Sequence, residues 1–547
     1  MGKHPYRLFL AAAAAAVCAL VLAACGSSSD STTSSPDEWG TSSPAASGSI
    51  DSVSWNLPYG EPFTLDYIQA LSPSDSTVLA NLCESLLRLG PDMTYEPGLA
   101  ESWDTPDETT VVFDLRPGLK FSNGDPVTTD DVIFSLERNL DPKLGSFWAP
   151  WFENVKSIDA TGKNQVTVNL SKPDVLFEQF MATAAGAVVE KSYVEEKGSE
   201  YGNSEGGVMC AGPYELSDWT PGKSITMTAN PNYWDSDNAP KAKQIDFSFV
   251  TNNQTAADAL KTGEIDGTFE APLSSWPTLT SSDSGNGYLG KTLAWAGLDF
   301  SQKAGPIQNV HFRRALLLSL DKEGIASSIY HGTAQPVRSG FFPSTWGYGE
   351  SVYKEAYDQL PDVQPDLEQA KAELAKVPDL QPIQLLSNAD DEAAKQLAAY
   401  IQSEAKKVGI EIELKELPAP QYVSAAFDQE QFNTYDMGLS LSAYLDVPEP
   451  VEAGVLSLTS GGVFNSSGYD NAAVDKWVSQ ARATADPDKR AALMVKVQEQ
   501  VYEKDVVSIP LINWATRVYM NSEISGVTTS LTPIFYSPWA TGLGATG

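Results

Sequence analysis

The chain has 547 residues, and its 71 acidic residues against 36 basic ones give a formal net charge of −35. Such a surface repels phosphate backbones, so nucleic acid is excluded as a partner. Hydrophobic residues make up 42% of the chain and aromatic residues 10%, which is ample for folded cores. A body of this length exceeds what one core usually supports, so we expect two or three structural lobes.

The N-terminus has the layout of a secretory signal peptide, because Lys3 and Arg7 precede an uninterrupted apolar run over residues 8–24. The segment LAACG, whose cysteine is Cys25, resembles the lipobox of bacterial lipoproteins, where cleavage precedes the cysteine and its sulfur is acylated. We therefore expect a signal peptide over residues 1–24 and a lipid anchor on Cys25. A plain signal peptide and a membrane-spanning anchor helix are the alternatives.

A low-complexity segment follows the expected lipid site. Residues 25–49 are rich in Ser, Thr, Gly, Pro and Ala and contain few large apolar side chains. Such a composition does not offset its own ordering entropy, so we expect a flexible tether. No second long apolar run appears downstream in the sequence, and the rest of the chain is expected to form a globular body outside the cell.

Two cysteines, Cys83 and Cys210, remain in this body once Cys18 leaves with the signal peptide and Cys25 is lipidated. Thiols in an oxidising compartment usually pair, so we expect a disulfide between them. Two separate buried thiols are the alternative. Closing a loop of more than 100 residues would constrain the unfolded chain by about 4 to 5 kcal/mol on the entropic model.

The sequence contains few signs of catalysis or metal binding. After the signal peptide only His311 and His331 remain, and His311 lies in the helical pattern of residues 309–320. The sequence has no nucleophile elbow, Walker loop, Cys-x-x-Cys or paired-His zinc spacing. Residues 235–240 imitate a calcium loop, but Pro240 occupies the sixth position, where the sharp turn needs Gly. We expect no catalytic residue, no metal site and no cofactor.

Strand and helix patterns alternate along the chain, which indicates an α/β body. Residues 111–115 (VVFDL) predict a short strand, and residues 129–131 supply caps for a helix. The expected apolar side of this helix consists of Val132, Ile133, Leu136 and Leu140.

The same alternation continues near the C-terminus. Asp486 and Pro487 open a helix, and residues 506–512 predict the strand that follows it. The apolar face of this second helix is expected to hold Leu493, Met494, Val497 and Val501. We detect no internal repeat in the sequence.

Residues 95–138 read YEPGLAESWDTPDETTVVFDLRPGLKFSNGDPVTTDDVIFSLER. This segment resembles the signature region of solute-binding protein family 5, the peptide, opine and nickel receptors of ABC importers. The resemblance continues in chain order through segments that begin at Cys210, Asn230, Leu260, Asn309, Tyr435 and Asp486. It covers nearly the whole body, and most of these motifs identify the fold without marking a site.

The resemblance implies an α/β, two-lobed, hinge-bending solute-binding protein of the type II periplasmic-binding-protein kind, with an extra subdomain inserted in lobe one. Lobe one is expected to combine residues 50–83, 211–293 and 516–547, with the inserted subdomain at 84–210 and lobe two at 294–515. Both body cysteines fall where lobe one meets the inserted subdomain, so a bridge would staple the two ends of the insertion. Bridges in Gram-negative relatives lie elsewhere.

One acidic residue is the main candidate for ligand contact. Peptide receptors of the family bind the ligand's α-amino group through an Asp just upstream of an acidic residue and Pro, and Asp446 in DVPEP matches this arrangement. Such a charge-assisted bond is worth about 1.5 to 3 kcal/mol. An Asp that caps a turn is the alternative. Related receptors often have Trp three residues before this Asp, whereas this chain has Ala443 followed by Tyr444, so the pocket wall differs.

Further candidates for the pocket wall come from segments that align with the family's ligand-contacting regions. They are Trp148, Trp514, Trp295, Leu71 and Ser72. Each aromatic residue taken alone is more often core than site. Peptide capture in this family resembles the addition of a strand between the lobes, so main-chain bonds would give broad specificity.

The resemblance also implies the partners and the location. We expect a monomer that binds a short peptide or similar small solute, delivers it to ABC importer permease subunits, and is anchored by lipid to the outer face of a Gram-positive cell membrane. The alternatives are an oligosaccharide receptor that uses some of the 13 Trp, an opine or nickel-chelate receptor, and a ligand-sensing lipoprotein that reports to a signalling partner.

Overall fold

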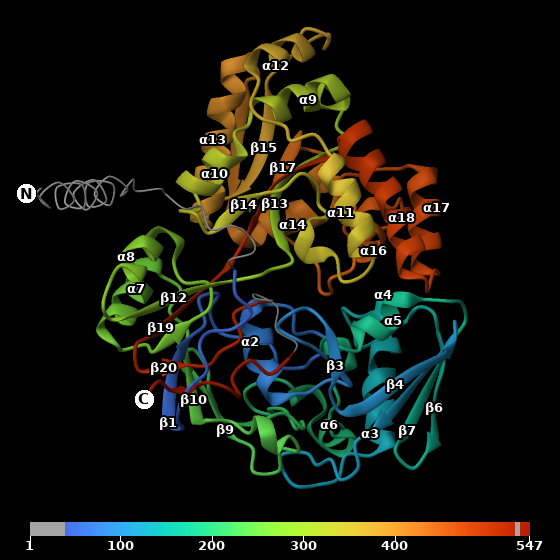
Figure 1. Ribbon diagram of the computed structural model, residues 1–547, viewed down its shortest axis with the longest axis vertical. Coiled ribbons are helices and arrows are strands. Elements are labelled where there is room, and N and C mark those ends of the chain that lie inside the picture. The colour runs from blue at the N-terminus through green and yellow to red at the C-terminus, as the bar shows by residue number, and fades with distance from the viewer. Residues whose placement is uncertain (1–38, 531–536) are drawn as a thin grey trace, which may run out of the picture.

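The computed structural model describes residues 39–530 and 537–547. The chain forms two lobes: the blue, green and C-terminal red segments build the lower part of Figure 1, and the yellow to red segments build the upper part. Three separate sheets of seven, four and six strands lie in lobe one, the inserted subdomain and lobe two. The expected mixed α/β, two-lobed class with an extra subdomain is confirmed.

Lobe one is built on a mixed sheet with the strand order β12-β19-β11-β1-β10-β9-β8. Its strands are β1 (Ile50–Asn56), β8 (Tyr214–Thr220), β9 (Ser224–Ala229), β10 (Ala242–Ser248), β11 (Gly267–Thr268), β12 (Gly285–Gly290) and β19 (Thr516–Asn521). Its helices are α2 (Pro73–Leu82), α7 (Asn253–Thr262) and α8 (Trp276–Thr280). A two-stranded pair, β20 (Ile524–Ser525) and β21 (Gly544–Ala545), follows at the C-terminus. The sheet thus joins strands from three distant parts of the chain.

The segment before β1 differs from the expected tether. Trp39 is only 2% exposed, and the N–H of Gly40 donates to the carbonyl of Leu289 at 2.9 Å. Gly48 pairs with Ala545 in an isolated bridge. Residues 39–49 are therefore part of lobe one, because backbone hydrogen bonds to its strands and the burial of one Trp order a segment that its composition alone would leave mobile. The expected signal peptide and Cys25 lie outside the described residues.

The inserted subdomain contains an antiparallel sheet in the order β4-β5-β7-β6. Its elements are β2 (Leu87–Leu89), β3 (Tyr95–Pro97), β4 (Ala100–Asp107), β5 (Thr110–Leu115), α3 (Thr129–Glu137), α4 (Ala149–Phe152), β6 (Val155–Gly162), β7 (Gln165–Leu170), α5 (Val175–Phe180) and α6 (Lys191–Lys197). The predicted strand is β5 and the predicted helix is α3, whose N-cap is Thr128, joined to Asp131 in a capping box. Leu140 is 41% exposed and not on the buried face, because α3 ends at Glu137.

Lobe two has the sheet order β14-β18-β13-β17-β15-β16. Its strands are β13 (Ala294–Phe300), β14 (Ala334–Pro336), β15 (Ile383–Asn388), β16 (Ile412–Leu417), β17 (Met437–Tyr444) and β18 (Ser508–Trp514). Its helices are α9 (Val310–Ser319), α10 (Lys322–Ser328), α11 (Glu350–Gln359), α12 (Leu367–Leu374), α13 (Glu392–Val408), α14 (Ala419–Phe427), α15 (Gln429–Phe432), α16 (Pro450–Ala453), α17 (Ala472–Arg482) and α18 (Pro487–Gln498). The predicted C-terminal helix is α18, capped by Asp486, and the strand after it begins at Ser508.

Two adjacent crossings connect the lobes. The chain passes from β12 to β13 through residues 291–293, and returns from β18 to β19 through Ala515. The side chain of Thr292 donates to the carbonyl of Trp514 at 2.5 Å, and the amide of Asn513 donates to the carbonyl of Ala294 at 2.7 Å. These bonds tie the two crossings together, which gives a hinge two strands wide.

The apolar core has two large parts. One part runs from lobe one through the inserted subdomain to α16, α17 and α18 of lobe two. The other lies inside lobe two, between its sheet and α9, α10, α12 and α13. Lobe two therefore contacts the inserted subdomain through its α16–α18 end, which lies above α4 and α5 in Figure 1.

Candidate functional site

The candidate ligand residue Asp446 follows the end of β17 and is 6% exposed. Its backbone N–H donates to both carboxyl oxygens of Glu452, at 3.0 and 3.1 Å, and the N–H of Val447 donates to the same carboxyl at 3.1 Å. Glu452 is fully buried, so these three contacts are shielded from water. The carboxyl of Glu452 thereby fixes the backbone that carries Asp446.

The two acidic side chains form a buried pair in which the charge of one acts on the other. Burial raises the pKa of Glu452 well above its usual range, and the charge of Asp446 raises it further. Because the two carboxyls lie together away from water, they favour holding one proton between them over carrying two negative charges. Burial also raises the pKa of the Tyr444 hydroxyl, with the two carboxyls adding to the shift. An ammonium group is the ligand chemistry that such a desolvated negative charge favours.

The other acidic residue of the motif has a structural role. Glu449 caps α16, since its Oε1 accepts the N–H of Val451 at 3.1 Å. Its Oε2 lies 3.3 Å from Nε of Arg490 and accepts from the amide of Gln179, in the inserted subdomain, at 3.2 Å. Glu449 thus caps the N-terminus of α16, and Asp446 is not needed as a cap.

Four of the predicted wall residues meet at one end of the lobe-two sheet. Trp295 lies opposite Ala443 on β17 and opposite Asn513 on β18, while Ala294 lies opposite Tyr444. Trp514 is the last residue of β18, beside the hinge. Trp295, Tyr444 and Trp514 are half-buried. The two strand pairings therefore bring Ala443, Tyr444, Trp295 and Trp514 close to the Asp446 segment.

Trp148 does not line a surface. Its side chain is fully buried, and its indole N–H donates to the carbonyl of Tyr67 at 2.9 Å. The adjacent Phe147 is half-buried instead, and its ring stacks on that of Phe464 in lobe two, with centroids 6.2 Å apart. Trp148 is therefore part of the core, where its indole N–H donates to a buried carbonyl. Phe147 is the aromatic residue that reaches lobe two.

The lobe-one segment at residues 71–72 offers one candidate ligand contact, whereas the sequence suggested two. The hydroxyl of Ser72 accepts the N–H of Asp75 at 3.1 Å, and the Asp75 carboxyl accepts the N–H of Ser72 at 3.0 Å. This capping box starts α2 and occupies the Ser72 side chain. Leu71 remains 43% exposed and is free to contact a ligand.

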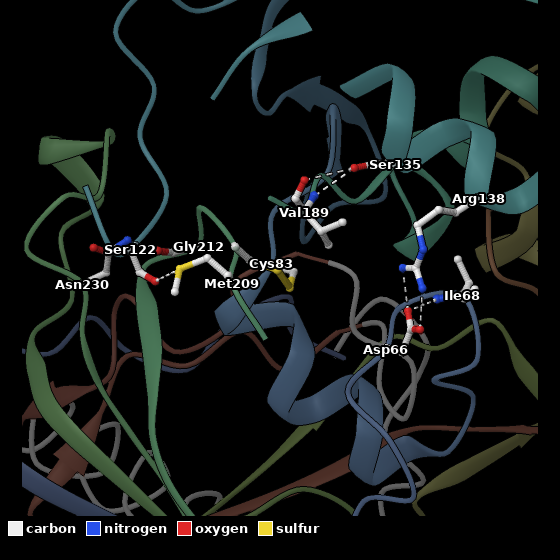
Figure 2. The surroundings of a disulfide bond; sticks show 11 residues. Asp66, Ile68, Cys83, Ser122, Ser135, Arg138, Val189, Met209, Gly212 and Asn230 are labelled. Atoms are coloured by element: carbon white, nitrogen blue, oxygen red, sulfur yellow. Dashed lines mark hydrogen bonds and ion pairs between the residues drawn. A yellow bond between two sulfur atoms is a disulfide. The ribbon is translucent and has the colours of Figure 1, made fainter. Parts of the chain in front are cut away.

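Cys83 and Cys210 form a disulfide, with their Cα atoms 4.8 Å apart. Cys83 follows the last residue of α2, and Cys210 pairs with Val189 in an isolated bridge. Figure 2 shows Cys83 beside Met209, with the ion pair between Asp66 and Arg138 nearby. The bond joins the points at which the chain enters and leaves the inserted subdomain.

Lobe two also holds the inserted subdomain by an ion pair. Nε and Nη2 of Arg482, at the end of α17, donate to the two carboxylate oxygens of Asp174 at 2.9 and 2.6 Å. Asp174 is the N-cap of α5, and Arg482 also donates to Glu153 at 2.7 Å. The partners are 308 residues apart in the chain. This contact spans the two parts that would have to separate for a ligand to enter between them.

Sequence reasoning missed Glu452, Phe147 and Arg482. Glu452 carried one weak signal, since it stands six positions after Asp446 in a stretch whose only other charged residue is Glu449. In the part of the chain that the structure describes, no helix is long and apolar enough to cross a membrane. The same residues contain no group of three or more His, Cys, Asp or Glu side chains arranged to hold a metal ion.

Comparison with known proteins identifies relatives along most of the chain. The oligopeptide-binding protein OppA of Bacillus subtilis is 28% identical over 492 residues, which cover 85% of this chain and 88% of the relative. The substrate-binding protein CtaP of Listeria monocytogenes superimposes with a TM-score of 0.79 at 20% identity, over 91% of this chain and 100% of that one. OppA of Haemophilus influenzae, solved with the peptide RPPGFSPFR, gives a TM-score of 0.73 at 22% identity, over 91% and 99%.

The family assignment rests on more than half of the chain. Residues 94–464 match the family model described as bacterial extracellular solute-binding proteins, family 5 middle. The matched range includes the sheet of lobe two up to β17, the Asp446 segment and most of the inserted subdomain. The chain therefore belongs to family 5 of the bacterial extracellular solute-binding proteins.

Proposed function

We propose that the protein captures a short peptide with a free α-amino group between lobe one and lobe two and delivers it to an ABC importer. The observation that carries this proposal is the Asp446 side chain, which belongs to a residue that is 6% exposed and whose backbone is fixed by the buried carboxyl of Glu452. The oligopeptide-binding relatives in Bacillus subtilis and Haemophilus influenzae support a peptide as the ligand class. The protein would thus bind its ligand without catalysing a reaction.

The chemistry of capture follows from desolvation. A buried carboxylate that meets an ammonium forms a charge-assisted hydrogen bond worth about 1.5 to 3 kcal/mol. Trp295 and Trp514 are half-buried near the same segment and offer apolar surface to the ligand. Main-chain bonds along an extended peptide would add affinity without reading side chains, so the proposed specificity is broad.

We further propose the domain limits that the sequence suggested, with the N-terminal limit of lobe one moved to residue 39. Lobe one then comprises 39–83, 211–293 and 516–547, the inserted subdomain 84–210, and lobe two 294–515. The membership of the three sheets supports these limits. The two tied crossings beside Thr292 support hinge closure, because they concentrate the connection between the lobes in two short segments.

Location and partners belong to the same proposal. Acylation of Cys25 would hold the protein on the outer face of a Gram-positive cell membrane, where two acyl chains give stable anchoring. A monomer would then present its two lobes to the permease subunits. The apolar run over residues 8–24 and the cysteine that follows it support this anchor.

A sugar is the second candidate ligand, and the half-buried Trp295 and Trp514 favour it, since sugars stack on indole rings. Mass spectrometry of the small molecules that copurify with the protein separates the candidates. We expect short peptides of mixed sequence. Recovery of an oligosaccharide, an opine or a metal chelate would contradict the peptide proposal.

A further inference from the structure

A small pocket in lobe one has polar groups that the Asp446 site does not use. It lies between the end of β1, the start of α2 and the segment after β11, and its volume of about 10 Å3 is room for one water-sized group. Ser74 and Glu270 contribute to its lining, together with Tyr59 and Phe269. The pocket adjoins Leu71 and Ser72, the lobe-one segment proposed to lie along the ligand.

Two buried oxygen atoms of this pocket have no hydrogen-bond partner among the described residues. They are Oγ of Ser74 and Oε1 of Glu270, whose side chains belong to residues that are 1% and 8% exposed. Buried polar atoms are almost always paired, and an unmade bond carries a desolvation penalty of about 1 to 3 kcal/mol. Two such acceptors in one pocket point to a donor that the protein receives from outside.

The carboxylate of Glu270 is held in place by its other oxygen. Nη2 of Arg517 donates to Oε2 at 2.8 Å, and Nε of the same guanidinium donates to the carbonyl of Ala271 at 3.0 Å. Glu270 also has a φ of +47°, a conformation that a side-chain-bearing residue rarely adopts. The chain thus keeps this carboxyl group fixed, and its Oε1 is left without a hydrogen-bond partner on a residue that lines the pocket.

Burial raises the pKa of Glu270, and the positive charge of Arg517 offsets part of this shift. Tyr59 as a residue is 56% exposed, but burial of its hydroxyl raises the pKa of that group. The charges that act on the hydroxyl are those of Glu270, Arg517 and Asp391. Asp391 caps α13 in lobe two. Burial likewise raises the pKa of Tyr330 in lobe two, where Asp391 and Arg517 again act. A hydrogen-bond donor is the group that the two unpaired oxygens favour, and a positively charged donor is also attracted by the Glu270 carboxyl.

We propose that Ser74 and Glu270 form a recognition pocket for the primary ammonium group at the end of a ligand side chain, as in a lysine-containing peptide. An ammonium is compact and carries three N–H donors and no acceptor, which matches two acceptors in a space for one water-sized group. A guanidinium is too large for this space, so lysine is favoured over arginine. The inference rests on the proposed function, because it requires a peptide between the lobes.

The test is calorimetric titration with alanine tripeptides that carry one lysine at position 1, 2 or 3, each matched with norleucine and arginine versions. We expect the wild-type protein to bind the lysine form at least about tenfold more tightly than both matched forms in one position. Ser74→Ala should lower this preference by about fivefold and Glu270→Gln by about tenfold or more. Glu264→Gln removes an exposed carboxylate of the same lobe and should leave it unchanged.

The outcomes separate this pocket from the proposed function. Ser74→Ala removes an atom that makes no hydrogen bond in the described structure, so it should fold as the wild type does, and a thermal melt checks this. Equal affinity for lysine and norleucine peptides at every position would mean that the pocket holds only a water. A lysine preference that both variants retain would also overturn the inference. Failure of every tripeptide to bind would overturn the peptide assignment, and this inference with it.

Discussion

Arg482 joins lobe two to the inserted subdomain, and removal of its guanidinium should weaken the closed arrangement. Arg482 and Asp174 are 9% and 6% exposed, whereas the side chain of Glu153, the third partner, is 52% exposed. A bidentate pair at a buried site is the strong kind of ion pair. A pair with a half-exposed carboxylate is worth at most about 1 kcal/mol. Ligand affinity should therefore depend on Asp174 and hardly on Glu153.

The magnitude follows from the groups that remain. Removing one partner of a buried ion pair typically costs about 3 to 5 kcal/mol. In the Arg482→Ala variant, Asp174 keeps the amide of Asn154 at 2.6 Å and the N–H of Leu176 at 3.2 Å. We therefore expect the lower end, about 3 kcal/mol, or roughly a hundredfold loss of affinity for a ligand that requires closure. If lobe two moves away from the inserted subdomain, Asp174 becomes exposed to water, and the variant no longer has the cost of an unpaired buried charge.

Titration with trialanine and solution scattering of the ligand-bound protein measure this effect. Glu153→Gln is the matched control and should bind within about fivefold of the wild type. The double variant Arg482→Met with Asp174→Asn should recover much of the loss, because no charge is left buried alone. If Arg482→Ala binds trialanine as tightly as the wild type and compacts to the same radius, the ion pair does not hold the lobes closed.

Three further predictions concern the anchor, the disulfide and the half-buried Asp299. Cys25→Ser should release the protein into the medium, and unchanged membrane retention would contradict lipidation. Non-reducing peptide mapping should recover Cys83 and Cys210 as one linked peptide; together they close 127 residues, so changing both to Ser should cost about 4 to 5 kcal/mol of stability on the entropic model. Burial raises the pKa of Asp299 from 3.8 to about 6, so the folded state binds the extra proton and stability falls as the pH rises through this window. Asp299→Asn should therefore raise the free energy of unfolding at pH 7.5 by up to about 3 kcal/mol, seen as a higher melting temperature, and leave both unchanged near pH 3. An equal stabilisation at both pH values would contradict this.

Local patterns predicted the elements whose signals are local. The strand at 111–115 and the helix opened by Asp486 and Pro487 appear as β5 and α18, since alternation and capping are properties of a few neighbouring residues. The buried face of α18 includes Met494 and Val497 as expected. The two-lobed class followed from the family resemblance over most of the chain.

The misplaced residues depended on contacts between distant segments. Trp148 and Phe147 are neighbours in sequence, and contacts with the distant Tyr67–Ile68 segment accompany the burial of Trp148. Residues 39–49 are ordered by strands near the other end of the chain. Neither effect leaves a mark on composition or periodicity.

The ligand site likewise combines a residue that the sequence identified with contacts that form only in the folded chain. The resemblance pointed to Asp446, but the carboxyl of Glu452 that fixes its backbone was visible only once the turn was folded. The orphaned oxygens of Ser74 and Glu270 likewise meet only in the tertiary structure, because these residues lie on segments about 200 positions apart.

Titration of the wild-type protein and the Asp446→Asn variant with free and N-acetylated trialanine shows whether Asp446 binds the α-amino group of the ligand. Asn keeps the size of Asp but removes the charge that offsets burial of an ammonium. We expect the variant to lose about two to three decades of affinity for the free peptide, or about 3 to 5 kcal/mol, and hardly to change its affinity for the acetylated one. Equal losses for both peptides would show that Asp446 shapes its turn without touching the amine, and no binding of either peptide by the wild type would contradict the peptide assignment itself.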